Sequence, residues 1–202
     1  LMGMTLIGRT ATTFARDKSL DENAMRRFLQ RFVDAKLGVY LGSGGSGEAH
    51  ALSRDELRRV YEIGVEVCKG KVPVYANPPE QHTARANIEH AQIAIDAGIE
   101  VVNIYGPAAW HGFRPTDQEF AAYYDEIFAA IKHPVALAPN PTIGYTPRPA
   151  LIADIANRYA QVVCVNLRGL QDHYLIDLKD LMKRTIEYYV PIDGSLNAFN
   201  LG

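Results

Sequence analysis

Short apolar runs alternate with amphipathic helical patterns along almost the whole of this chain of 202 residues. Most of the runs are rich in β-branched residues and are flanked by Gly, Pro or Asn, as buried strands are. They predict strands over residues 8–13, 37–41, 72–76, 101–105, 135–138, 162–167 and 190–193. A strand followed by a helix, repeated many times, predicts a parallel sheet in an α/β protein.

The segments between these runs carry apolar residues at helical spacing. They predict helices over residues 20–35, 53–68, 83–97, 116–131 and 147–159, with a more broken helical segment over 174–187. Ser53 followed by Glu56 fits a capping box at the start of the second helix. Gly98 is a plausible C-terminal cap of the third.

Two architectures satisfy this alternation, an open doubly wound sheet and a closed (β/α)8 barrel. A barrel usually needs about 250 residues, so a chain of 202 residues would hold only about seven βα units. We see no linker, charge block or low-complexity segment. We therefore expect a single domain over 1–202, and a (β/α) barrel domain would be truncated after its seventh strand. The open sheet and the barrel both stay open at this point.

Composition excludes several classes of partner. The chain has 21 Lys and Arg against 23 Asp and Glu, a balance that disfavours nucleic-acid binding. It has no apolar run as long as a membrane span, so we expect no membrane partner. Cys68 and Cys164 lie in apolar runs, which predicts reduced core thiols of a cytoplasmic protein. No cluster has metal-ligand spacing, so we expect no metal and no cofactor.

Residues 42–48, Gly-Ser-Gly-Gly-Ser-Gly-Glu, follow the second predicted strand and precede the helix at Ser53. Glycines at such a junction expose backbone N–H groups and can hold an anion. The loop also fits the dinucleotide pattern G-x-G-x-x-G. However, it follows the second strand, and the helix starts six residues after Gly47. The next strand ends at Tyr75-Ala76-Asn77 without an acidic residue that could hold a ribose hydroxyl. A flexible turn is the other alternative.

The stretch 44–48 followed by Leu52-Ser53 resembles the Gly-Thr-Thr-Gly-Glu…Leu-Ser segment of the dihydrodipicolinate synthase / N-acetylneuraminate lyase family of class I pyruvate aldolases. Residues 12–14, 96–99 and 193–195 also match that family, and the order and spacing of all seven units agree. The resemblance implies a TIM (β/α)8 barrel with only about seven βα units in this chain.

The resemblance also implies a ligand and an assembly. In the family, hydroxyl and N–H groups of this loop bind the carboxylate of pyruvate or another 2-oxo acid. By position, Gly45 and Ser46 would do so here. Family members are commonly dimers or tetramers, so a homo-oligomer is expected.

Three positions depart from the family pattern. The family's Schiff-base lysine at the end of strand six corresponds to Asn166, and its strand-five tyrosine corresponds to Ala138. The family's Pro-Tyr-Tyr after strand four reads Pro-Ala-Ala at 107–109. An amide nitrogen cannot form an imine, and no lysine lies between Lys132 and Lys179. The chain is therefore expected to be an atypical member that lacks the Schiff-base lysine.

Polar residues at the carboxyl ends of barrel strands usually face the active site. On this basis the candidate catalytic residues are Asn166, Arg168, Tyr105 and His111, and the candidate substrate-binding residues are Gly45, Ser46, Asn140 and Ser195. Three of these residues have two interpretations. Arg168 either binds an anionic group of the substrate or pairs with an acid at the rim. Asn166 either orients a carbonyl or water, or it satisfies loop backbone. His111 is a general acid or base, or simply an exposed histidine.

Three functions stay open at this point. The first is a lyase acting on a small 2-oxo acid or related carboxylate by a Schiff-base-independent route, through enolisation, hydration or cleavage of a carbon–carbon or carbon–oxygen bond. The second is an ordinary aldolase or synthase of the family. The third is a non-catalytic paralogue that binds the carboxylate without turnover.

Overall fold

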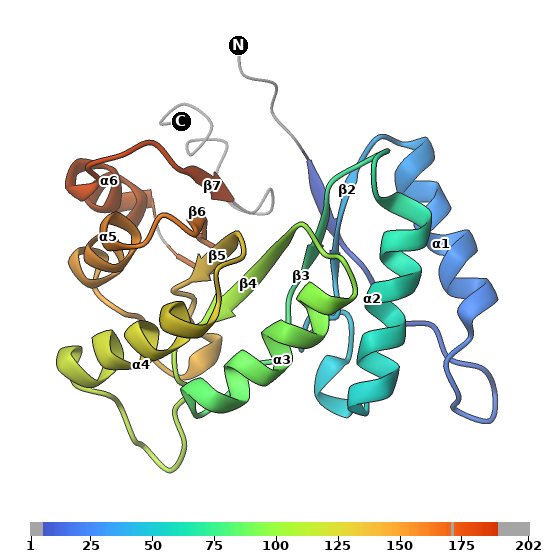
Figure 1. The fold of residues 1–202 in the computed structure, drawn as a ribbon, viewed down its shortest axis with the longest axis horizontal. Coiled ribbons are helices and arrows are strands. Elements are labelled where there is room, and N and C mark those ends of the chain that lie inside the picture. Colours follow the sequence, from blue (N-terminus) through green and yellow to red (C-terminus); the bar gives the residue numbers. More distant parts are fainter. Residues whose placement is uncertain (1–5, 171, 190–202) are drawn as a thin grey trace. The chain divides into compact units, whose positions relative to one another are not determined.

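The computed structural model describes residues 6–170 and 172–189 (Figure 1). In this part of the chain the strands are β1 (Ile7–Arg9), β2 (Gly38–Leu41), β3 (Val74–Ala76), β4 (Val101–Tyr105), β5 (Val135–Ala138), β6 (Val162–Asn166) and β7 (Glu187–Tyr189). The α-helices are α1 (Glu22–Asp34), α2 (Arg54–Cys68), α3 (Ala84–Asp96), α4 (Asp117–Ala130), α5 (Pro149–Arg158) and α6 (Asp172–Leu181). Two short 3-10 turns, η1 (Ala49–Ala51) and η2 (Pro141–Ile143), follow β2 and β5.

The strands follow one another in the sheet in chain order, from β1 to β7. The pairs β1–β2, β2–β3, β3–β4, β5–β6 and β6–β7 are all parallel. Each α-helix from α1 to α6 connects one strand to the next. This is the parallel strand–helix alternation that the apolar pattern predicts.

The chain divides into two compact units. The first holds the described residues up to Pro79 and Glu89–Val102, and the second holds Glu80–Ile88 and the described residues from Asn103 onward. The division therefore falls inside α3 and inside β4. A single barrel domain over 1–202 stays a prediction.

In the first unit, α1 and α2 lie side by side (Figure 1). Asp21 caps α1 by accepting from the Ala24 N–H, and Ser53 with Glu56 forms the expected capping box on α2. Arg59 of α2 ties the helices together, because its guanidinium donates to both carboxylate oxygens of Glu22 on α1, at 2.8 and 2.7 Å. The buried residues of β2 and the inner faces of these helices form the core of this unit.

In the second unit, α4 buries Phe120, Tyr124, Ile127 and Phe128, and every residue of β5 is buried. α5 packs against both α4 and α6 (Figure 1). The guanidinium of Arg184 donates to Ala156 O and Tyr159 O at the end of α5, at 2.8 and 2.9 Å. Those helix-terminal carbonyls have no partner within the helix, so the arginine satisfies them.

The ends of the chain differ most from the predicted elements. β1 ends at Arg9 instead of residue 13, because Thr12 and Thr13 turn their hydroxyls to Gly47 O and Asp21 O, at 2.6 and 2.8 Å. β7 occupies Glu187–Tyr189 and pairs with Cys164–Asn166, immediately before the predicted strand 190–193, which lies outside the described residues. The segment predicted as broken begins with the regular helix α6, which buries Tyr174, Leu175 and Leu178.

Candidate functional site

We call the loop after β2, residues 42–48, the glycine loop. Two of its glycines are required by its backbone conformation and close packing. Gly42 has φ +65°, and a Cβ there would lie 2.8 Å from the Tyr61 ring. A Cβ on Gly47 would lie 2.7 Å from the backbone nitrogen of Ser43. No side chain fits at that distance, so both glycines are required by the fold of the loop.

Hydrogen bonds complete the loop. The Gly47 N–H donates to Ser43 O at 3.1 Å, and the Ser43 and Ser46 hydroxyls lie 2.7 Å apart. The Thr12 hydroxyl, in the segment after β1, donates to Gly47 O at 2.6 Å. The loop is thus a built turn anchored to the neighbouring strand, which argues against a merely flexible connection.

Gly45 is different from Gly42 and Gly47, because a Cβ there would meet nothing within 4 Å. Gly45 and Ser46 are exposed, and among the described residues their backbone N–H groups donate no hydrogen bond. Glycine at an unobstructed position leaves the main chain open to a ligand. The main chain at Gly45 and Ser46 is therefore accessible, and their role in binding a carboxylate stays a prediction.

η1 separates Gly47 from the start of α2. The N-terminus of α2 consequently does not abut the loop as the helix of a dinucleotide site does. Glu48 has a left-handed backbone with φ 53°, and its carbonyl accepts from the Ala51 N–H at 2.8 Å. Glu48 thus helps to build the turn through its backbone.

In the second unit, Asn166 is the last residue of β6 and is only 5% exposed. Its Nδ2 donates to Oδ1 of Asn103, on β4, at 3.3 Å, and its Oδ1 accepts from the Arg168 N–H at 3.3 Å. Both ends of the amide are therefore engaged, and Asn166 satisfies loop backbone, one of the two interpretations given above. The other interpretation, that it orients a carbonyl or water, stays a prediction.

The register of β5 and β6 places Ala138 beside Asn166. Ala136 pairs with Cys164 and Leu137 with Val165, so Ala138 and Asn166 come next in both strands. Residues level with each other on parallel strands point to the same face of a sheet. Ala138 forms a buried cluster with Tyr105 and Ile143, against which Tyr145 packs. The Tyr145 hydroxyl itself donates to Pro107 O at 2.8 Å.

Asn140 stands two residues beyond the end of β5 and caps η2. Its Oδ1 accepts from the Thr142 N–H at 3.0 Å and from the Thr142 hydroxyl. Its Nδ2 is buried and has no hydrogen-bond partner among the described residues. A buried donor without a partner costs free energy, and such a group often marks a place where a ligand or water binds.

Two of the other candidates lie on the surface. The Arg168 side chain is exposed and makes no ion pair with any described residue. His111 is exposed, has φ 50°, and lies edge-on to the ring of Trp110 with centroids 5.4 Å apart. Within the described residues no hydrogen bond connects it to Asn166 or Tyr105. Ser195 lies outside the described residues.

Sequence reasoning missed Asn103. It is 1% exposed and is the only polar residue of the run Val-Val-Asn-Ile-Tyr that forms β4. A polar side chain in the middle of an otherwise apolar buried strand must be hydrogen-bonded or costs free energy. This single polar residue in an apolar run was the sequence signal that could have identified Asn103.

Among residues 6–170 and 172–189, no group of three or more His, Cys, Asp or Glu side chains could hold a metal ion. Nor does any helix in the same residues have the length and apolar character needed to cross a membrane. Cys68 and Cys164 are buried and free, as predicted.

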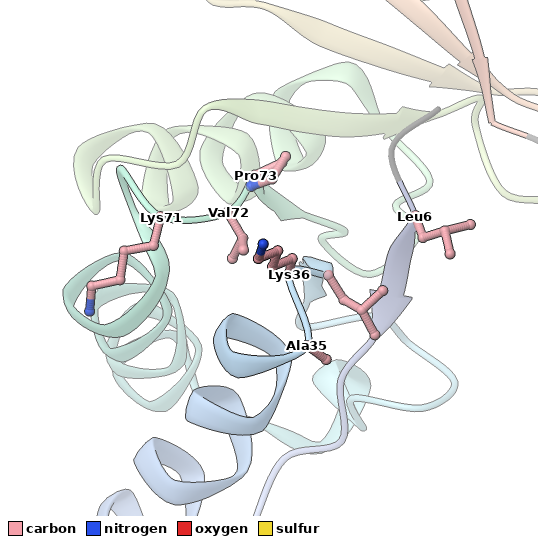
Figure 2. Close-up of a pocket in the computed structure, with 7 residues that line it drawn as sticks. Leu6, Ala35, Lys36, Lys71, Val72 and Pro73 are labelled. Atoms are coloured by element: carbon pink, nitrogen blue, oxygen red, sulfur yellow. The ribbon is translucent and has the colours of Figure 1, made fainter. Parts of the chain in front are cut away.

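A hollow of about 490 Å³ lies in the first unit (Figure 2). It is lined by Leu6, Ala35, Lys36, Leu37, Lys71, Val72 and Pro73. Leu6, Leu37 and Pro73 each directly precede a strand, so the hollow lies at the amino ends of β1–β3. The Lys71 ammonium donates to Val67 O at 2.8 Å, at the end of α2. In barrel enzymes the amino-terminal ends of the strands serve stability and the carboxyl ends carry the chemistry.

Parallel strands in chain order with a helix after each of β1 to β6 define part of a TIM barrel. Comparison with known proteins agrees. The Dihydrodipicolinate synthetase family model matches residues 3–197. The chain belongs to this family.

A 4-hydroxy-tetrahydrodipicolinate synthase of Brucella suis is 30% identical over 166 residues, which cover 80% of this chain and 52% of that protein. The chain spans about half the length of the curated relatives it matches. A dihydrodipicolinate synthase of Bacillus anthracis superimposes with a TM-score of 0.86 at 18% identity, covering 100% of this chain and 68% of the other. A family protein of E. coli solved in complex with pyruvate superimposes with a TM-score of 0.77 at 20% identity, covering 91% and 60%.

Proposed function

We propose that this protein is a lyase-type enzyme that acts on a small 2-oxo acid or related carboxylate without a Schiff base. Family membership supports a lyase, and the similarity to a protein solved with pyruvate supports a 2-oxo acid as ligand. The observation that carries the proposal is Asn166, which ends β6 as a buried amide held at both of its ends.

In this proposal the glycine loop binds the substrate carboxylate, a role that rests on the family resemblance. The exposed N–H groups of Gly45 and Ser46 and the Ser46 hydroxyl are donors suited to a carboxylate. The Arg168 guanidinium, exposed at the start of the segment after β6, is suited to a further anionic group on a larger substrate.

The amides supply a different chemistry from a lysine. An amide N–H donates a hydrogen bond to a carbonyl oxygen and donates a stronger one to the enolate that forms when a neighbouring carbon loses a proton. One such preorganised donor contributes about 3–4 kcal/mol to transition-state stabilisation in other enzymes. Tyr105, two residues from Asn103 on β4, is the proposed proton carrier on that face, with His111 as the exposed alternative.

The test follows the methyl protons of pyruvate in D2O by NMR, with and without borohydride. Catalysed exchange of those protons for deuterium without a covalent adduct is expected, and the Asn166→Leu variant should lose the exchange. A borohydride-stable adduct on a lysine would instead identify an ordinary aldolase or synthase. Thermal stabilisation by pyruvate without exchange would identify the non-catalytic binder.

Two further expectations belong with this function. The free buried Cys68 and Cys164 support a reducing, cytoplasmic compartment. The family resemblance supports a homo-oligomer, a dimer or tetramer, which light scattering on the purified protein would measure.

A further inference from the structure

Asn103 is a buried amide in the middle of β4, and its position needs a reason. Only 1% of the residue is exposed. An amide taken out of water costs about 1–3 kcal/mol unless it finds partners. Asn103 finds one in Asn166, whose Nδ2 donates to its Oδ1 at 3.3 Å.

This bond reaches across an intervening strand. β5 lies between β4 and β6 in the sheet, so the two backbones are about 10 Å apart. The residue level with Asn166 on β5 is Ala138, whose methyl group leaves room for the two amides to meet. A large side chain at position 138 would stand where they meet.

The bond to Asn103 also determines how Asn166 is oriented. Asn166 Oδ1 accepts from the Arg168 N–H, and one Nδ2 hydrogen of Asn166 is donated to Asn103. These two bonds fix the plane of the amide and leave its second Nδ2 hydrogen as a donor for a ligand. Asn140 is held in a similar way, because Thr142 occupies its Oδ1 and leaves its buried Nδ2 without a partner. Asn140 follows β5 and Asn166 ends β6, the adjacent strand.

We propose that Asn103, Asn140 and Asn166 form an amide subsite for an uncharged oxygen on carbon 2 of the ligand. Asn140 and Asn166 donate to that oxygen, and Asn103 is a positioning residue that orients Asn166. The ligand class rests on the proposed function, whereas the oxygen and the role of Asn103 do not follow from the family resemblance. Neutral donors suit a carbonyl or hydroxyl oxygen, and both remain donors after the oxygen becomes an enolate.

Three small acids isolate the contribution of the oxygen on carbon 2 from that of the ligand carboxylate. Pyruvate carries a carbonyl on carbon 2, lactate a hydroxyl, and propionate neither, while all three carry the same carboxylate. Their affinities are measured by NMR titration against the wild-type protein and three variants. The ratio of pyruvate affinity to propionate affinity reports the subsite and is insensitive to a general loss of folding.

Asn103→Leu removes the acceptor that orients Asn166. Asn140→Asp keeps the oxygen that Thr142 needs and replaces the unpartnered donor. Asn157→Leu is the control, because Asn157 also bonds at both amide ends, to Leu181 O and Lys183 N, but on α5. Because the two test variants perturb different elements, one of them suffices if the other fails to fold.

We expect wild-type protein to prefer pyruvate over propionate, and Asn103→Leu and Asn140→Asp each to reduce that preference about tenfold. Asn157→Leu should keep the wild-type ratio. A matching preference for lactate would assign the subsite to any carbon-2 oxygen, and its absence would restrict the subsite to carbonyls. An unchanged ratio in a folded Asn103 or Asn140 variant would overturn the subsite but leave the proposed function standing. Binding of none of the three acids would overturn both.

Discussion

The side-chain amide of Asn166, at the end of β6, donates to the side-chain oxygen of Asn103 on β4 over 3.3 Å. The two residues lie 63 positions apart in the chain and on strands that do not pair with each other. β5 lies between those two strands in the sheet, and its residue level with Asn166 is Ala138. The family resemblance predicts that residue 166 corresponds to the Schiff-base lysine, and that correspondence stays a prediction.

The first prediction concerns the stability of that contact. Asn166→Leu removes the donor to Asn103 and the acceptor of the Arg168 N–H, so it should lower the free energy of unfolding by about 1–3 kcal/mol. Urea unfolding at neutral pH measures the change. A leucine variant as stable as the wild type would show that the two amides gain nothing from each other in solution.

The second prediction separates the glycines of the loop. In Gly47→Ala the new methyl group would lie 2.7 Å from Ser43 N, so the variant should lose about 1–3 kcal/mol of stability. Gly45→Ala meets nothing within 4 Å and should stay within about 0.5 kcal/mol of the wild type. Thermal and urea unfolding of the two variants side by side provide the comparison. Equal losses would contradict the different roles given to these glycines.

The third prediction concerns thiol chemistry. Burial raises the pKa of the Cys68 thiol to about 11, and burial also raises the pKa of Cys164 well above its ordinary value. The thiolate is the reactive form, and at pH 8 only about one thousandth of a thiol with that pKa is ionised. Iodoacetamide should therefore label the native protein at least about 100-fold more slowly than the urea-unfolded protein. Mass spectrometry after timed quenching reads both cysteines, and rapid native labelling would contradict the burial.

The fourth prediction is a pH dependence of the contact between α1 and α2. Hydrogen bonds from Arg59 hold the pKa of Glu22 below its usual range, and hydrogen bonds from Arg26 and then Arg59 do the same for Glu66. Because both pKa values are lower in the folded state, the unfolded state binds more protons. The stabilisation is therefore present above the unfolded carboxyl pKa of about 4.3 and is lost as the pH falls through the lower folded values.

Arg59→Met tests this dependence. Its melting temperature should lie below that of the wild type at pH 7, and the gap should shrink toward pH 3. Arg54→Met is the control, since Arg54 forms a single exposed pair with Glu89 and should change little at either pH. A gap that stays constant between pH 7 and pH 3 would mean that packing of the arginine stem, not its charge, stabilises the helices.

Local sequence patterns predicted the regular elements well where burial is complete. The predicted strands 101–105 and 135–138 coincide with β4 and β5, whose residues are all buried. The capping box at Ser53 was also correct, because it depends on residues three positions apart. The first strand was predicted too long, because Thr12 and Thr13 bond to Gly47 and Asp21, which are distant in sequence.

The candidate site residues came from local signals in the sequence. Gly45 and Ser46 were proposed because they match a local motif, and Asn166 because it occupies the end of a recognisable strand. Asn103 was not found, because a single polar residue inside a strand says nothing about its partner. The roles of Arg168 and His111 stay predictions, and both side chains are exposed.

The sequence by itself determined the alternation of strands and helices, the parallel sheet and the family, since periodicity, caps and motifs are encoded within each segment. Only the tertiary structure decided which glycines the loop needs and which amides meet. Those properties depend on side chains that approach from distant segments, as Tyr61 does at Gly42 and Asn103 at Asn166. The order of the strands in the sheet and the packing of the helices on it set that approach, and neither can be read from the residues that make the contact.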